Sequence, residues 1–204
     1  MISTSPFYKE RIIKIFSEKK DIVDIGGSLR LLKDRGNIHT TQHNWLMPYL
    51  EKVSYRILDV VPDYNPHIVG DIHALPFDNN TIDAILCISV LEHVEDPRQA
   101  IKEMYRVLKP GGYCFVYVPF LFYYHAEKGY FPDYWRFTKD VLPVLFKDFS
   151  FMEIKSALGA IATWVNISPL GAVRPVASLA SFLDLVFHKR DSNQASGYDI
   201  FLIK

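Results

Sequence analysis

Three aspartates lie at or near the ends of apolar runs that predict strands, namely Asp24, Asp59 and Asp71. An ionised carboxylate only accepts hydrogen bonds, through two oxygens, so the one at the second strand end could hold both hydroxyls of a ribose. The one at the third strand end could accept from an adenine amino group. Asp83 differs, because it opens its strand and is expected at the opposite edge of the sheet. This pattern favours a nucleoside-like ligand at one edge.

The turn after Asp24 reads Gly26, Gly27 and Ser28. Glycine has no Cβ, so a backbone can approach a ligand closely there, and the free N–H groups can face an anion or a carboxylate. By itself the run is equally typical of a tight strand-to-helix turn. A nicotinamide dinucleotide would require Gly-x-Gly-x-x-Gly, but Arg30 and Leu31 stand at the later glycine positions. The sequence also has no Gly-x-x-x-x-Gly-Lys-Ser/Thr motif for a nucleoside triphosphate.

These side chains must be positioned by alternating strands and helices. Helix starts are indicated at Ser5-Pro6 and Asp96-Pro97, where a capping residue precedes proline at the first helical position. A further helix is predicted over 40–52 and another from Asp140. The alternation predicts an α/β fold with a mostly parallel sheet covered on both faces, and ligands bind such sheets at the carboxyl ends of the strands. The predicted strands are 21–26, 55–61, 67–71, 82–89, 113–119, 151–156 and 198–203.

Composition narrows the class of protein. The 204 residues suit one domain over 1–204, and the formal net charge of zero gives no general attraction to nucleic acid or to an anionic membrane. No apolar run reaches the roughly 18 residues of a membrane-spanning helix, and the first residues lack a signal-peptide layout. We therefore expect a cytoplasmic protein without a transmembrane segment. Cys87 and Cys114 are expected to be buried reduced thiols, and no metal site is predicted.

The order of these pieces resembles a class I S-adenosylmethionine-dependent methyltransferase of the large small-molecule group, methyltransferase type 11-like. The resemblance covers 21–119, and Leu-Glu-His-Val followed by Arg-Val-Leu-Lys-Pro-Gly-Gly after a strand is its most specific signal. It implies a Rossmann-like three-layer sandwich whose seven-stranded sheet has an antiparallel last strand. The matching stretches are Asp-Ile-Gly-Gly-Ser at 24–28, Ile-Leu-Asp-Val at 57–60, Gly-Asp-Ile-His-Ala-Leu-Pro-Phe at 70–77, and the blocks at 82–97 and 105–112.

The resemblance also implies roles for residues around S-adenosyl-L-methionine. Near the methionine part it implies Asp24, Gly26, Gly27 and Ser28; at the ribose Asp59 with Val60; at the adenine Asp71 and Ile72; and under the sulfonium Ser89 and Val90. One departure concerns the family's Gly-x-Gly-x-Gly motif. Ser28 and Arg30 replace its later glycines, which questions the packing of the first helix and the affinity for the cofactor.

The segment 120–138 follows the strand that ends at Pro119 and should cross the same sheet edge. Its His…Pro-Asp-Tyr-Trp-Arg-Phe-Thr pattern resembles methyltransferases met in sugar and cell-envelope contexts. It offers a base, His125 or Asp133, with His93 as a further candidate. Alternatively, the segment is a packed loop in which its arginine pairs with its aspartate. The candidate acceptor-binding residues are Tyr134, Trp135 and Arg136.

The segment 157–187 is unusually apolar for a connection between strands. It could be a lid over the acceptor, a homodimer or partner surface, or a helix near lipid. The sequence thus predicts a methyltransferase acting on a small-molecule or carbohydrate-like acceptor, with oxygen as the expected methylated atom. The alternative is a catalytically inactive methyltransferase-like fold that acts as a binding or assembly subunit.

Overall fold

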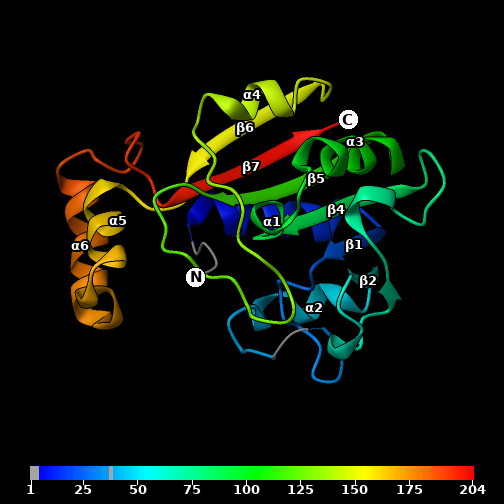
Figure 1. Cartoon of the computed structure of the whole chain (residues 1–204), viewed down its shortest axis with the longest axis horizontal. Coiled ribbons are helices and arrows are strands. Elements are labelled where there is room, and N and C mark those ends of the chain that lie inside the picture. The colour runs from blue at the N-terminus through cyan, green and yellow to red at the C-terminus, as the bar shows by residue number, and fades with distance from the viewer. Residues whose placement is uncertain (1–4, 37–38) are drawn as a thin grey trace.

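A seven-stranded sheet forms the centre of the structure, a computed structural model that describes residues 5–36 and 39–204. The strand order is β3-β2-β1-β4-β5-β7-β6 (Figure 1). The pairs from β3 to β5 are parallel, whereas β7 runs antiparallel to both β5 and β6. This confirms the predicted Rossmann-like sheet with its antiparallel closing strand. The strands are β1 Asp21–Ile25, β2 Ser54–Asp59, β3 Ile68–Val69, β4 Ile82–Ile88, β5 Leu108–Pro119, β6 Phe151–Ser156 and β7 Gly197–Ile203.

Two of the helices begin at the capping signals read from the sequence. Ser5 Oγ accepts a hydrogen bond from Tyr8 N at 3.0 Å, and Asp96 Oδ1 accepts from the backbone of Arg98 and Gln99. Each cap satisfies backbone N–H groups that the first helical turn leaves without partners. The helices are α1 Pro6–Glu18, α2 Met47–Leu50, α3 Pro97–Val107, α4 Val141–Leu145, α5 Ala160–Ile167 and α6 Arg174–Val186, with single 3-10 turns at Asn44–Leu46, Pro62–Tyr64, Ile72–Ala74, Leu91–His93 and Pro169–Ala172.

Helices cover both faces of the sheet because alternate strand residues point to opposite sides. Ile85 and Cys87 of β4 pack in the core beneath α3. Ala84 and Leu86, their neighbours in the strand, pack in the second core beneath α1. Cys87 and Cys114 are buried free thiols, as predicted. The β4 strand, buried on both faces, thus fixes the position of the loop that follows it.

The prediction of a helix over 40–52 was wrong. Within that range the structure has only the 3-10 turn Asn44–Leu46 and the single-turn helix α2, Met47–Leu50. A helix through 40–52 would place Pro48 in its interior, where proline removes a backbone hydrogen bond and clashes with the preceding turn. Neither short element has a capping side chain. Among the described residues between β1 and β2, these two elements are therefore the only helical turns.

The apolar segment 157–187 forms a helical pair, α5 and α6, which lies beyond the carboxyl end of β6 (Figure 1). Asp184 of α6 is buried and accepts from Ile161 N and Ala162 N, so it caps α5 and ties the two helices together. More than half of the surface of several apolar side chains is exposed, including Trp164, Phe182 and Leu185. No helix among the described residues is long and apolar enough to cross a membrane.

Candidate active site

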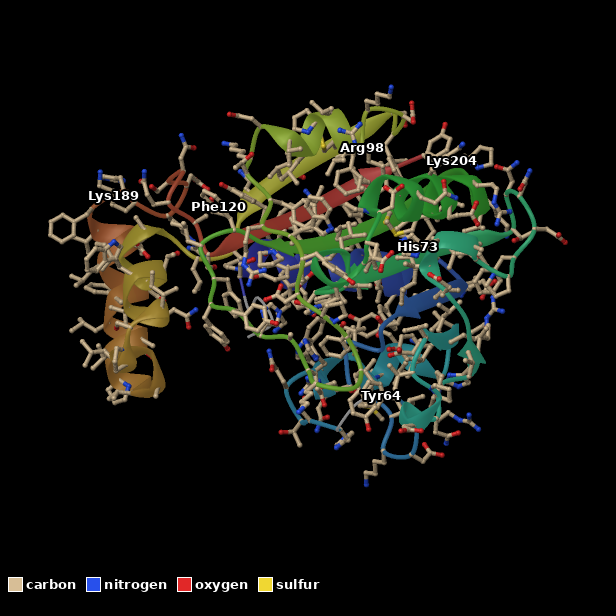
Figure 2. All side chains as sticks on the ribbon, viewed as in Figure 1. Tyr64, His73, Arg98, Phe120, Lys189 and Lys204 are labelled. Atoms are coloured by element: carbon tan, nitrogen blue, oxygen red, sulfur yellow. The ribbon has the colours of Figure 1, made fainter. Side chains whose placement is uncertain are left out.

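A cavity of about 510 Å³ opens at the carboxyl ends of β1, β2 and β4. Figure 2 labels Tyr64 and His73, which are two of its lining residues. One half is lined by the strand ends and their turns, and the other by the segment after β5. Of the predicted cofactor residues, those on the lining are Gly26, Ser28, Asp59, Val60, Asp71, Ile72, Ser89 and Val90; Asp24 and Gly27 are not on it.

The glycine turn brings bare backbone to the cavity wall. Gly26 has a φ of 80° and Gly27 a φ of 58°, both in the left-handed region that favours glycine. A Cβ on Gly26 would lie 2.7 Å from Cγ2 of Val90. Arg30 adopts a φ of 51°, the conformation of a glycine, and lines the cavity. The turn thus keeps a left-handed backbone at Arg30, where the family motif has glycine, and adds a cation.

We expect Gly26→Ala to lower the free energy of unfolding by more than Gly111→Ala does. Gly111 has a φ of 72° but no atom within 4 Å of the Cβ it would gain, so it reports the conformational cost alone, roughly 1 kcal/mol. Gly26→Ala adds the clash with Val90. Urea unfolding of both variants measures the difference, and Val90→Ala in the Gly26→Ala background should recover part of it. Equal losses in the two variants would show that the close approach is unimportant.

Asp24 supports the turn from beneath rather than facing the cavity. It is fully buried, and its Oδ2 accepts from Leu29 N at 3.2 Å and from the Tyr55 hydroxyl. Its Oδ1 has no hydrogen-bond partner among the described residues. Burial raises the pKa of Asp24 to about 7 because the charged form loses its hydration. The side chain therefore ties β1, its turn and β2 together.

Asp59 and Asp71 are brought to the cavity by neighbouring strand ends, as the sequence predicted for one edge. Asp59 Oδ1 accepts from Val61 N at 2.9 Å, and burial raises the pKa of its carboxyl. Asp71 is exposed and binds both the backbone and the ring of His73. Asp83 lies at the opposite edge, as expected, where it pairs with Lys109.

The loop of residues 120–138 is fixed to the turn after β4 by hydrogen bonds to carbonyl oxygens of that turn. Tyr134 N donates to the Glu92 carbonyl at 2.7 Å, and Trp135 Nε1 donates to the Val94 carbonyl at 2.8 Å. Tyr134 lines the cavity, whereas Trp135 and Arg136 do not. The loop therefore contributes its first part, around residues 122–134, to the cavity wall.

Arg136 is engaged within the loop. Its guanidinium holds both carboxylate oxygens of Asp133, at 2.6 and 2.7 Å, and lowers the pKa of that carboxyl to about 2. Asp133 in turn accepts from His125 N at 2.9 Å. This is the packed-loop arrangement weighed from the sequence, and neither Arg136 nor Asp133 reaches the cavity lining. Both instead hold His125 in place.

His125 and His93 do line the cavity, with their ring centroids 4.9 Å apart. The Glu92 carboxylate, with smaller contributions from the Tyr123 carbonyl and Asp133, raises the pKa of His125. Two other histidines differ in position: His73 lines the cavity, whereas His43 is buried against Tyr8 and Leu29.

Sequence reasoning missed several lining residues. Glu92 stands in the Leu-Glu-His-Val motif, but nothing in the pattern showed that this residue lines the cavity. Tyr64 and Tyr130 stack at a centroid distance of 5.6 Å although they are far apart in the chain. Segment 120–138 contributes to the lining, whereas none of the described residues of 157–187 does. The role of segment 157–187 as a lid or partner surface stays a prediction.

Comparison with known proteins supports this picture. Residues 26–116 match a family model described as a methyltransferase domain. A ubiquinone/menaquinone biosynthesis C-methyltransferase from Ruegeria sp. is 35% identical over 97 residues, which are 45% of this chain and 39% of that protein. A probable tRNA methyltransferase 9B from Bos taurus is 33% identical over 130 residues, 57% of this chain and 27% of that protein. The chain thus spans well under two thirds of the length of these relatives.

A solved S-adenosylmethionine-dependent methyltransferase from Archaeoglobus fulgidus superimposes with a TM-score of 0.60 at 13% identity, covering 97% of this chain and 92% of that one. A second, from Mesorhizobium loti, gives 0.58 at 10% identity over 98% and 99% of the two chains. At these identities the likeness shows the fold.

The cavity lining fits the cofactor of this family, S-adenosylmethionine. Gly26 leaves a wall that a Cβ would fill against Val90, and Asp59 and Asp71 present carboxylate acceptors at neighbouring strand ends. Hydroxyl and amino donors of a nucleoside match such acceptors. Residues 26–116 thus match a methyltransferase domain, and the chain has the fold of solved S-adenosylmethionine-dependent methyltransferases.

Proposed function

We propose that this domain catalyses S-adenosylmethionine-dependent methyl transfer to a small-molecule or carbohydrate-like acceptor, at oxygen. One observation carries the proposal: a single cavity joins the glycine turn and two strand-end carboxylates to a pair of imidazoles. When bound, the cofactor supplies an electrophilic methyl group. The chain's own residues would hold it, align the acceptor and keep water away from the reacting atoms.

On the cofactor side, we propose that Asp59 holds the ribose hydroxyls and that Asp71 with Ile72 borders the adenine. Gly26 and Ser28 would face the methionine part. Arg30 lies on the same wall, and its cation can pair with the methionine carboxylate. The departure from the family's glycine pattern would then contribute to binding rather than prevent it.

On the acceptor side, His125 lines the cavity together with His93 and Tyr134. A hydroxyl becomes a better nucleophile when its proton is removed. His125 can accept that proton itself or hold a cation that lowers the pKa of the hydroxyl. The zero net charge favours a small acceptor over a nucleic acid.

Calorimetric titration of the chain with S-adenosylhomocysteine tests the proposal, followed by transfer of a labelled methyl group to a pool of small cellular metabolites. We expect saturable binding and label in a small-molecule fraction. No heat of binding at millimolar ligand would overturn the cofactor assignment. Label found only in RNA would overturn the acceptor class.

We expect His125→Ala to lower turnover on such an acceptor about tenfold while the affinity for S-adenosylhomocysteine stays unchanged. The imidazole lies in the acceptor half of the cavity, so its loss removes activation without touching the cofactor side. Single-turnover rates and calorimetry of the same variant measure the two quantities. His39→Ala is a matched control, since His39 does not line the cavity. Normal turnover of His125→Ala would reject its role.

The alternative function, an inactive binding or assembly subunit, is favoured by one observation, the exposed apolar side chains on α5 and α6. Such surfaces often mark contacts between proteins. Cofactor binding without turnover on any acceptor, together with a stable complex with another protein, would support this alternative.

A further inference from the structure

Three potential metal ligands converge in the acceptor half of the cavity: Glu92, His93 and His125. Their ligand atoms all lie within 4.8 Å of one another. Nε2 of His125 is 3.6 Å from Oε1 of Glu92, and Nε2 of His93 is 4.0 Å from the same oxygen. Two ligands on one Zn²⁺ ion lie roughly 3.3 Å apart, given metal–ligand distances of about 2.1 Å. Small side-chain rotations would therefore bring the three atoms to bonding distance.

The Glu92 carboxylate in this cluster is buried and has no hydrogen-bond partner among the described residues. Its side chain is only 1% exposed, and neither carboxylate oxygen accepts a hydrogen bond from any residue in the described part of the chain. A buried carboxylate without hydrogen bonds is costly unless a cation compensates it. The two imidazoles lie 3.6 and 4.0 Å from Oε1 of Glu92, beyond the 3.5 Å limit of a hydrogen bond. A cation placed between the three side chains would satisfy it.

The surroundings of the two histidines leave the correct nitrogens free. Nδ1 of His93 lies 2.6 Å from the Pro132 carbonyl oxygen. Nδ1 of His125 lies 3.1 Å from the Tyr123 carbonyl oxygen and 3.2 Å from Oδ2 of Asp133. Carbonyl and carboxylate oxygens only accept, so each Nδ1 carries a proton and each neutral ring keeps its lone pair on Nε2. Metal-binding histidines are oriented by such second contacts.

We propose that Glu92, His93 and His125 bind one divalent transition-metal ion, of the Zn²⁺ class, beside the acceptor. Two imidazoles and one carboxylate favour such ions over Mg²⁺, which prefers oxygen ligands. Asp133 then acts as a positioning residue, because it contacts the ring of His125. Arg136 holds Asp133 in place through their ion pair. Three protein ligands leave further positions open for an acceptor oxygen.

The role of the ion rests on the proposed methyl transfer, whereas its binding does not. An acceptor hydroxyl on the ion has a lowered pKa. Its proton leaves to water, and the electron pair of the O–H bond stays on the oxygen, which is then the nucleophile for the methyl group. As the new O–C bond forms, the bond between the methyl carbon and the sulfonium sulfur breaks, its electron pair stays on the sulfur, and S-adenosylhomocysteine leaves. The ion is neither oxidised nor reduced, so no further co-reactant is needed.

Titration of the chelator-treated full chain with Zn²⁺, in the absence of cofactor, tests the site by calorimetry, and visible absorption of added Co²⁺ reports the ligands. We expect one ion per chain, and His93→Ala and His125→Ala should each weaken binding more than about tenfold, 1.4 kcal/mol. Glu92→Gln, which keeps the shape of the buried side chain, should also weaken it. His39→Ala, outside the cavity, and Glu127→Gln, an exposed carboxylate on its lining, are matched controls.

Titration of the same variants with S-adenosylhomocysteine separates this proposal from the proposed function. Loss of Zn²⁺ binding with cofactor affinity retained in His93→Ala and His125→Ala supports a separate metal site. Zn²⁺ binding that persists in both variants, or equal affinity for Mg²⁺, would overturn it. An absence of Zn²⁺ binding while S-adenosylhomocysteine still binds would overturn it too, and would leave His125 and Glu92 as a simple ion pair.

Discussion

Asp59→Ala is expected to weaken binding of S-adenosylhomocysteine between about tenfold and a hundredfold, roughly 1.4 to 2.7 kcal/mol. The Asp59 carboxylate lies on the cavity wall at the end of β2, where it can accept from both hydroxyls of a ribose. Hydrogen bonds to a charged acceptor contribute about 1.5–3 kcal/mol. Burial also raises the pKa of Asp59, so hydroxyl donors would relieve a carboxylate that is poorly hydrated. Isothermal titration calorimetry measures the change directly.

Two companion variants make the Asp59 result interpretable. Asp59→Asn can keep the hydrogen bond from Val61 N but replaces one acceptor oxygen with a donor, so it should also weaken binding. Asp78→Ala removes an exposed carboxylate that is not on the cavity lining and should leave the affinity unchanged. Unchanged affinity in both Asp59 variants would remove Asp59 from the ribose role.

Asp24→Asn is expected to flatten the dependence of stability on pH between pH 5 and 8. The folded-state pKa of Asp24 is raised from 3.8 to about 7. A raised pKa contributes stability that is fully present below the unfolded pKa and is lost as the pH rises through the folded value. The wild-type chain should therefore lose about 2–3 kcal/mol from this group over that range. Asparagine does not titrate, so the variant should not show this loss.

Urea unfolding at several pH values compares the two proteins, and groups common to both cancel in the difference. Tyr55→Phe provides a second arm, because the Tyr55 hydroxyl donates to Asp24 and favours its charged form. Its removal should raise the pKa of Asp24 further and extend the loss of stability to higher pH. Parallel pH profiles for wild type and Asp24→Asn would contradict the raised pKa of this buried carboxyl.

The strands and two of the helix starts could be predicted because their signals are local. β4 is apolar apart from Asp83, and Asp96-Pro97 caps α3 by contacts within three residues. Strand direction then placed Asp59 and Asp71 at one edge, since parallel strands share their carboxyl ends. The helix predicted over 40–52 does not form because Pro48 would lie in its interior, where proline removes a backbone hydrogen bond.

The candidate site could be predicted only in part. The turn at Gly26 and the strand-end carboxylates lie close to their motifs in the sequence, so the resemblance carried them to the correct edge. Arg136 could not be decided, because the choice between a ligand and Asp133 depends on the path of a loop. Glu92, His93 and His125 could not be recognised as a cluster, since His125 reaches the others only through that same loop.

The sequence by itself therefore determined the strands, by resemblance the seven-stranded sheet with its antiparallel last strand, and the glycine turn with its acids, because apolar runs, turn residues and helix caps act within a few residues. The tertiary structure decided which side chains face the cavity. It turned Asp24 inward as a buried support and kept Arg136 in an ion pair within its loop. It also left the Glu92 carboxylate without a hydrogen bond between two imidazoles. Those outcomes depend on burial and on contacts between distant segments, which local patterns do not encode.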